Sequence, residues 1–420
     1  MKIMKDINVH LENKKVSRAF FAYIFIMYSV VYMTKSCFTG ALSSIVAEGS
    51  LTTTQTTFIL GAFYIVYAPL QLVGGIFADK YSPEMLITVG LLGGAASNIV
   101  IFFNQNYYVM LAVWIFNAII QFALWPSVFK IVSSQLVRSD RKNMIFLLSL
   151  ATSVGLILTR VVSSLIPSHA WRYNFAVSAV SLIISAIILK IFCVKLDPII
   201  KKDTPVQEAK ESKPISSVKT SKLFLISGFF FVLPAVLIRT MIETGTKNFS
   251  SLMLMQSYDH VSSTTGELLS IIIAIGGLAG VFLAKFVLFP KIIKNEITGC
   301  LLLTLFTIPF SYLLSLIGKT PVWSIVLSLT MINLLLTTTH LFVNYYNMGF
   351  TKYGKNGTAA GIINAAAAAG MAFQFWIFGP ISETLGWPVV TTIWVAMVAV
   401  TALCFALALR PANKFKKENT

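Results

Sequence analysis

The sequence predicts an all-α membrane protein with twelve transmembrane helices in two six-helix halves. Hydrophobic residues make up 56% of the 420 residues, charged residues make up 12%, and the mean hydropathy is +0.79. Soluble domains carry about 25% charged residues. Apolar runs long enough to cross a bilayer recur along the chain, and one long polar stretch divides them into two groups. This composition excludes a disordered, collagen-like, coiled-coil or disulfide-rich protein.

The apolar stretches are expected to be helices because they are continuously apolar and do not alternate every second residue. In lipid, only helices and closed barrels satisfy their own backbone hydrogen bonds. The twelve expected spans are residues 18–47, 53–78, 84–103, 107–135, 142–167, 171–194, 222–248, 264–289, 293–317, 321–349, 356–382 and 387–409.

Lysine and arginine positions predict the orientation, because cytoplasmic loops carry an excess of both. Most of them fall on the side of the two termini, whereas the opposite side carries Arg172, Lys247 and Lys319. Both termini of this multi-pass protein are therefore expected in the cytoplasm, at the cell membrane. The predicted parts are tail 1–17, half 18–194, linker 195–221, half 222–409 and tail 410–420. The net charge of +17 follows from this bias and requires no nucleic acid.

Six helices, a linker and six helices resemble the major facilitator superfamily of secondary transporters. The loop after the second span contains Gly75, Asp79 and Lys80, which are similar to a gating motif of that superfamily. The resemblance implies that the glycine permits a close approach of two helices. It also implies that the aspartate secures the cytoplasmic closure.

A narrower resemblance is to the organophosphate:phosphate antiporters, which transport glycerol 3-phosphate and hexose phosphates. Four segments carry it: Tyr28 with residues 32–38, Trp125 to Ser127 with Lys130, residues 236–239, and residues 357–361. The resemblance implies exchange of a phosphorylated metabolite for inorganic phosphate.

The sequence departs from this family pattern in three of the spans. Lys35-Ser36 replaces an Arg-Lys pair, Gln71 replaces a lysine, and Thr152 replaces the histidine of the glycerol-phosphate branch. A basic residue remains in each half.

Four bases lie deep in the expected spans, at Lys35, Lys130, Arg160 and Arg239, and Glu243 is the only acid at that depth. A charge at the bilayer centre costs at least about 2.5–3.5 kcal/mol, so such residues face a cavity or a partner. With too few carboxylates to pair these bases, an anionic ligand is expected. Glu243 follows Arg239 by four residues, so the two are expected to pair when the site is empty.

Lys35 and Arg239 occupy equivalent positions in the two halves, 17 residues after Arg18 and Lys222 respectively. Equivalent positions of such halves are expected to face one another across a central cavity at the midplane. The predicted substrate-binding residues are Lys35, Arg239, Tyr28, Tyr32, Gln71, Trp125, Lys130, Thr152 and Tyr346. Glu243 is the predicted switch.

The expected partners are a small anionic substrate, inorganic phosphate as counter-substrate and the lipid bilayer, and the protein is expected to be a monomer. No metal or cofactor is expected, since the four cysteines and four histidines do not cluster. No nucleotide-binding loop and no catalytic set is present, so the protein is not expected to be an enzyme.

Two alternatives remain open at this point. The first is a proton symporter of a sugar acid or other carboxylate, with Glu243 as the titrating group. The second is a transporter-like sensor of a metabolite, which the short predicted tails disfavour.

Overall fold

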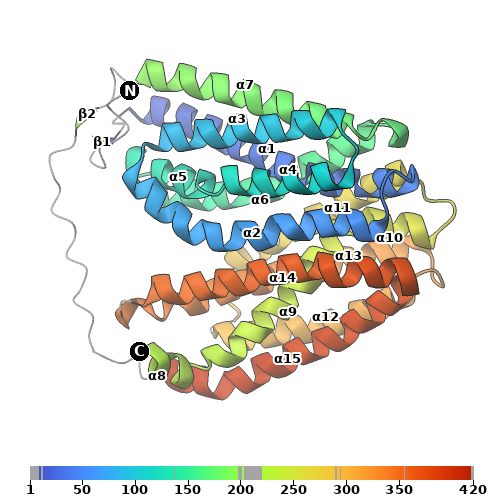
Figure 1. Ribbon diagram of the computed structural model, residues 1–420. Helices are drawn as coiled ribbons and strands as arrows, with labels where there is room; N and C mark the ends of the chain where they lie inside the picture. The colour runs from blue at the N-terminus through green and yellow to red at the C-terminus, as the bar shows by residue number, and fades with distance from the viewer. Residues whose placement is uncertain are drawn as a thin grey trace. The chain divides into compact units, whose positions relative to one another are not determined.

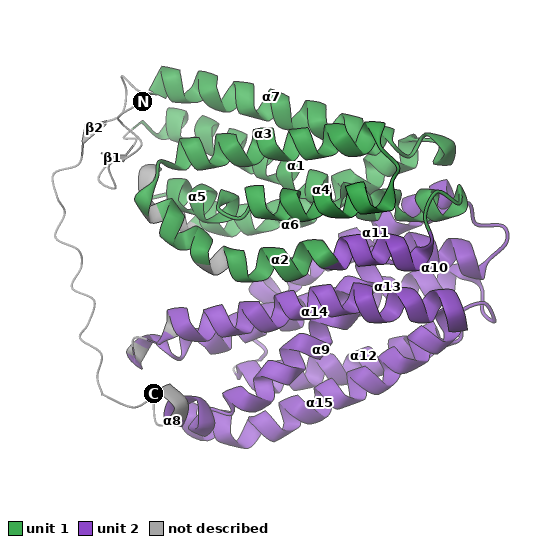
Figure 2. Ribbon diagram, in the orientation of Figure 1, with its two compact units in different colours: residues 1–51, 62–209 green, residues 52–61, 210–420 purple. Residues whose placement is uncertain are grey.

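The computed structural model describes residues 9–10, 13–137, 139–196, 201–202, 220–288, 291–293, 295–353 and 355–417. Nearly all of them are helical (Figure 1). The chain divides into two compact units, residues 1–51 with 62–209 and residues 52–61 with 210–420 (Figure 2). Most of the predicted linker, 195–221, and the end of the C-terminal tail lie outside the described residues.

The first unit contains the helices of the N-terminal part of the chain, together with a minimal antiparallel strand pair, β1 and β2. In chain order these elements are β1 (Val9–His10), α1 (Lys14–Ala47), α2 (Thr53–Lys80), α3 (Pro83–Phe103), α4 (Tyr107–Ile120), α5 (Leu124–Lys130), the π-helical η2 (Ile131–Gln135), α6 (Arg141–Leu165), the 3₁₀ turn η3 (Ser168–Ala170), α7 (Tyr173–Leu196) and β2 (Lys201–Lys202). The first turns of α2, through Gly61, belong to the second unit.

The second unit contains the remaining helices. They are α8 (Thr220–Ile226), α9 (Phe229–Asn248), α10 (Ser250–Ser257), α11 (Ser263–Phe282), the π-helical η4 (Leu283–Leu288), α12 (Glu296–Ser315), α13 (Val322–Met348), the 3₁₀ turn η5 (Thr351–Tyr353), α14 (Asn356–Leu385) and α15 (Trp387–Lys417).

A helix or a pair of consecutive helices occupies each of the twelve expected spans. Among the described residues, eleven helices are long and apolar enough to cross a membrane. The twelfth expected span is α2, a helix of 28 residues that is not among those eleven. The predicted all-α membrane architecture is therefore confirmed.

Local sequence signals set where several helices begin. The side chain of Asn13 accepts hydrogen bonds from the first turn of α1, and Ser82 does the same for α3, whose first residue is Pro83. Capping oxygens of this kind satisfy backbone N–H groups that have no partner within the helix. At the start of α9, Gly228 has a φ of 77°, a left-handed conformation that favours glycine.

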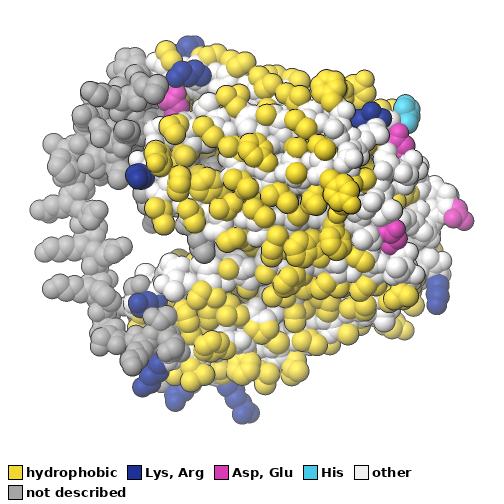
Figure 3. All heavy atoms as spheres, in the orientation of Figure 1, with side chains coloured by type: hydrophobic (Ala, Val, Ile, Leu, Met, Phe, Trp, Pro, Cys, Tyr) yellow, Lys and Arg dark blue, Asp and Glu magenta, His cyan; other side chains and the backbone are white. Residues whose placement is uncertain are grey.

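Each unit has its own apolar core. In the first, α1 packs against α6 and α7; in the second, α9 packs against α13, α14 and α15. Hydrophobic side chains also cover the visible flank of each unit along its helices, whereas charged side chains gather at helix ends (Figure 3). Exposed apolar flanks of this extent are stable in lipid and not in water.

Candidate functional site

Lys35 is buried in the first unit and is held by an aromatic residue. Only 8% of its surface is exposed. Its Nζ donates a hydrogen bond of 2.8 Å to the hydroxyl of Tyr67 and lies 4.4 Å from the centre of that ring. Among the described residues, no carboxylate lies within ion-pair distance of Lys35. A buried ammonium that is held by a neutral phenol alone keeps its positive charge available to an anion.

Two predicted site residues of the first unit pack together near the middle of α1. The rings of Tyr28 and Trp125 have centroids 4.8 Å apart. Tyr32, one turn after Tyr28, lies opposite Gly155 of α6, where an added Cβ would come within 2.7 Å of the Tyr32 Cβ. Glycine is therefore required at position 155 for α1 and α6 to approach this closely.

The remaining predicted site residues of the first unit are placed differently. Lys130, the last residue of α5, donates to the carbonyl oxygen of Ala78 at 2.5 Å and so caps the end of α2. The hydroxyl of Thr152 donates to the carbonyl of Ser149 in its own helix. The side chain of Gln71 lies outside the described residues. Whether these three residues bind substrate stays a prediction.

Arg239 has 1% of its surface exposed and lies in α9 of the second unit. One terminal nitrogen, Nη1, donates to Glu243 and to the carbonyl of Leu336. The other, Nη2, donates to the hydroxyl of Thr240 at 2.9 Å and contacts His340 Nδ1 at 3.2 Å. All four terminal N–H donors are therefore occupied, and Nε has no hydrogen-bond partner. An anion can take a two-point grip on Arg239 only by displacing part of this set.

The contact with His340 defines the tautomer of that histidine. An arginine guanidinium has donors and no acceptor, so Nδ1 of His340 must accept. His340 is consequently neutral, with its proton on Nε2. His340 is therefore an interior residue whose Nδ1 has a hydrogen-bond donor.

Glu243 is shared between two cations. Its Oε2 accepts from Arg239, which shows the pairing that the four-residue spacing predicts. Its Oε1 accepts from Lys247 Nζ at 2.5 Å and from the hydroxyl of Thr337 at 2.9 Å. Lys247 Nζ also donates to Thr337, at 3.1 Å. The four residues form one connected polar cluster.

Lys247 is the member of this cluster that the sequence reasoning missed. The sequence places Lys247 at the end of a span, with Arg172 and Lys319 on the side of the membrane opposite the two termini. In the structure it lies in the last turn of α9, its side chain is only 18% exposed, and α10 begins two residues after α9 ends. The signal was present, because Lys247 follows Glu243 by four residues.

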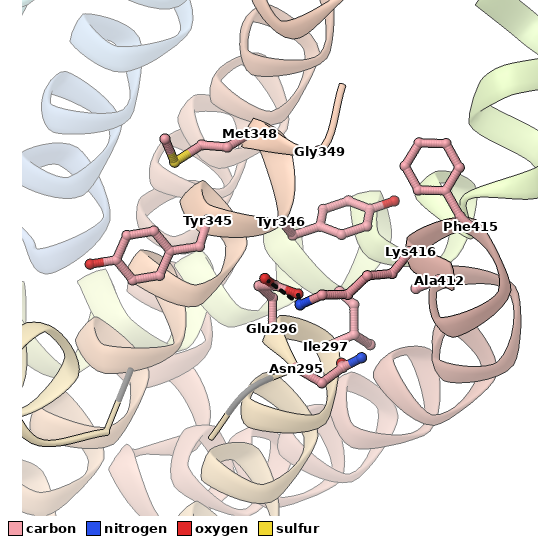
Figure 4. Close-up of a pocket in the computed structure, with 10 residues that line it drawn as sticks. All are labelled: Asn295, Glu296, Ile297, Tyr345, Tyr346, Met348, Gly349, Ala412, Phe415 and Lys416. Atoms are coloured by element: carbon pink, nitrogen blue, oxygen red, sulfur yellow. Dashed lines mark hydrogen bonds and ion pairs between the residues drawn. The ribbon is translucent and has the colours of Figure 1, made fainter. Parts of the chain in front are cut away.

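Tyr346 lies away from the cluster. Its hydroxyl donates to the carbonyl of Ser227 at 2.9 Å. It lines a cavity of about 170 Å³ formed by the ends of α12, α13 and α15, where Lys416 pairs with Glu296 (Figure 4). His340, which touches Arg239, precedes Tyr346 by six residues, or about 9 Å along α13. The structure therefore does not bring Tyr346 next to Arg239.

At the predicted gating motif, the close helix approach occurs one residue earlier than expected. An added Cβ at Gly74 would come within 2.8 Å of the carbonyl oxygen of Phe122, whereas an added Cβ at Gly75 would meet nothing within 4 Å. Lys80 is exposed and lies 5.7 Å from the ring of Tyr81. The side chain of Asp79 lies outside the described residues.

The described residues contain no group of three or more histidine, cysteine, aspartate or glutamate side chains that could hold a metal ion. The site residues described above can form reversible ionic contacts. They supply cations, the Glu243 carboxylate that Arg239 and Lys247 share, and hydroxyl groups.

Several curated proteins are similar to this chain over part or most of its length. The membrane sensor protein UhpC of Escherichia coli is 25% identical over 167 residues, which is 40% of this chain and 38% of that protein. A probable hexose phosphate transport protein of Chlamydia muridarum is 21% identical over 392 residues, or 88% of this chain and 84% of that protein. The chain thus matches less than two-fifths of the length of the sensor and most of the length of the transport protein.

The fold is also found among solved structures. A bacterial homologue of the human lysosomal transporter Spinster, in an inward-facing and occupied conformation, superposes with a TM-score of 0.71. The two chains are 14% identical in sequence. The superposition covers 99% of that chain and 97% of this chain. Residues 24–374 match the Major Facilitator Superfamily as a whole. The chain is a multi-span membrane protein that belongs to the Major Facilitator Superfamily.

Proposed function

We propose that this transporter exchanges a small phosphorylated metabolite for inorganic phosphate by alternating access. Lys35 and Arg239 bind the anion, and Glu243 holds Arg239 while the site is empty. The protein lies in the plasma membrane, and both of its termini lie in the cytoplasm. Support comes from relatives named as hexose phosphate transport proteins and from the buried cations Lys35 in the first unit and Arg239 in the second.

The proposal depends chiefly on the terminal nitrogens of Arg239, whose four N–H donors are all occupied. Its terminal N–H groups are taken by Glu243, Leu336, Thr240 and His340, and its charge is buried. A phosphate or carboxylate is the ligand that matches a guanidinium in two-point geometry. An anion that takes both terminal nitrogens competes with Glu243 for Nη1, which couples its binding and release to one exchangeable ion pair. This arrangement suits exchange of one anion for another.

Substitution of Glu243 by glutamine tests the switch. In vesicles that are loaded with phosphate, the Glu243→Gln variant keeps phosphate exchange, and its half-saturating phosphate concentration falls because a neutral amide competes less well for Arg239. The measurement is counterflow of labelled phosphate at several concentrations. If the variant loses uptake driven by a proton gradient but keeps exchange unchanged, the protein is a proton symporter and the proposal fails.

A metabolite sensor is a second candidate, because two of the relatives are named as membrane sensor proteins. A sensor of this type binds the anion without sustained turnover. Phosphate or hexose phosphate that binds the purified protein, together with no exchange in vesicles, favours the sensor.

A further inference from the structure

Lys247 contacts Glu243 beside Arg239, and the predicted set of binding residues does not include it. The two oxygens of Glu243 face different cations. Arg239 occupies Oε2, while Lys247 and the hydroxyl of Thr337 occupy Oε1. Lys247 and Thr337 are also bonded to each other, so Nζ, Oγ1 and Oε1 form a closed triangle. This triangle does not depend on Arg239.

When Arg239 turns to an incoming anion, Oε2 loses its partner. A buried carboxylate that loses its only cation is penalised by desolvation and takes up a proton instead. Glu243 is not in that position here, because Oε1 retains both Lys247 and Thr337. The contact of Oε1 with Lys247, at 2.5 Å, involves no atom of Arg239.

The other elements around the cluster do not supply a substitute for Lys247. The charged and titratable groups that act on Glu243 are Arg239 and Lys247 from α9 and His340 from α13. His340 uses Nδ1 to accept from Arg239. On the neighbouring helices, α11 presents Gly277 to Lys247, and α14 and α15 present Gln374 and Trp394 to Gly245 of α9, none of which carries a charge. Among the described residues, Lys247 is thus the cation that remains for Glu243.

We propose that Lys247 is a positioning residue that keeps Glu243 ionised while Arg239 binds the substrate anion, so that the exchange cycle takes up no proton. This inference rests on the proposed function and specifies how its switch operates. Lys247 does not touch the anion; it acts through Glu243. Its side chain is 18% exposed and flexible, which lets Nζ follow the carboxylate as Arg239 moves away.

The test is a pH profile of phosphate exchange by the full-length protein in phosphate-loaded vesicles between pH 6 and pH 8. Lys247→Met keeps the length and apolar stem of the side chain and removes the charge. Each rate is divided by the wild-type rate at the same pH, which cancels the titration of phosphate itself. A pH-sensitive dye inside the vesicles reports any proton that moves with phosphate.

The Lys247→Met variant is expected to exchange phosphate at least about tenfold more slowly, relative to wild type, at pH 8 than at pH 6, because a proton must now neutralise Glu243. Protons are expected to move with phosphate in this variant and not in the wild type. For Lys247→Arg, the exchange rate relative to wild type is expected to be the same at pH 6 and pH 8. The double variant Lys247→Met with Glu243→Gln is also expected to be flat, because no carboxylate remains to be protonated.

Asp140→Asn provides the matched control for removal of an ion pair. The Arg18 guanidinium, hydrogen-bonded to Asp140 at 2.9 Å outside the spans, holds the pKa of that carboxyl below its ordinary value. A carboxyl with a lowered pKa is ionised throughout pH 6 to 8. The Asp140→Asn ratio is therefore expected to be flat over this range.

Two results overturn the role of Lys247. The first is a ratio of Lys247→Met rate to wild-type rate that does not change with pH. The second is a pH-dependent ratio that persists in the double variant. Should the methionine variant elute as an aggregate, Lys247→Gln replaces it in the same comparison. If the wild-type protein itself exchanges no phosphate, the proposed function fails and the role of Lys247 in exchange fails with it. Wild-type exchange with a flat Lys247→Met ratio leaves the proposed function intact and removes this inference alone.

Discussion

At the scale of single residues, Lys35 and Arg239, the two cations of the proposed site, are held in different ways. Lys35 is held by the hydroxyl and ring of Tyr67, which are uncharged. Arg239 is held by a carboxylate that an anion must displace. Lysine offers a compact charge that can turn with its ligand, whereas arginine offers a planar fork. The pair therefore combines a mobile contact with an oriented one.

Removal of either cation is expected to abolish transport. Lys35→Ala and Arg239→Ala are each expected to lower phosphate exchange by about 30-fold or more, because truncation of a buried charged partner costs about 2–5 kcal/mol. Membrane abundance is expected to stay near wild type. Lys190→Ala is the control, since Lys190 is exposed and pairs with Glu84 at a helix end. A Lys35 or Arg239 variant that exchanges phosphate at the wild-type rate contradicts the site assignment.

The sequence predicted only the part of the cluster that follows from helix periodicity. Arg239 and Glu243 are four residues apart, so one helix face must carry both. Thr337 and His340 lie about a hundred residues later in the chain, and only the packing of α13 on α9 brings them to the same point. No local pattern encodes that contact.

At the scale of helices, apolar length predicted the spans but not their interruptions. The fourth span is broken between α4 and α5, where Pro126 lies in the first turn of α5 and cannot donate to the carbonyl of Phe122. α15 continues to Lys417, beyond the predicted end at residue 409. Lys416 there pairs with Glu296 at 2.8 Å, and Phe415 packs on Phe350. These tertiary contacts extend a helix whose last turns are too polar to be predicted as membrane-spanning.

The contact between α9 and α14 positions Arg239 and depends on glycine. An added Cβ at Gly370 would come within 2.6 Å of the carbonyl oxygen of Leu237, two residues before Arg239. The same addition at Gly357, in the first turn of α14, would meet nothing within 4 Å. The two glycines therefore form a matched pair in one helix.

Gly370→Ala is expected to shift α9 away from α14, lowering both the melting temperature and the exchange rate. Gly357→Ala is expected to keep the exchange rate and to raise the melting temperature slightly, because alanine is favoured over glycine in a helix by about 1 kcal/mol. Thermal unfolding of the two purified variants, alongside phosphate exchange, makes the comparison. Equal behaviour of the variants would show that the α9–α14 contact does not position Arg239.

At the scale of the whole molecule, each unit has its own core, and buried cations lie in both: Lys35 and Arg160 in the first unit and Arg239 in the second. The first turns of α2 belong with the second unit, where the backbone N–H of Thr54 donates to Glu383 at 2.6 Å and the ring of Phe58 stacks on Trp376. The rest of α2 belongs with the first unit. The all-helical membrane fold followed from the composition and the long apolar runs. The division of α2 between the two units could not be predicted from the sequence, because it depends on how the first turns of α2 pack against α14.

The central claim is exchange of one anion for another without a proton gradient. Uptake of labelled glucose 6-phosphate into vesicles containing the purified protein tests it most directly, with and without phosphate inside and with and without a protonophore. Uptake is expected to require internal phosphate and to be unchanged by the protonophore. Uptake that proceeds without internal phosphate and stops when the proton gradient collapses would contradict the claim.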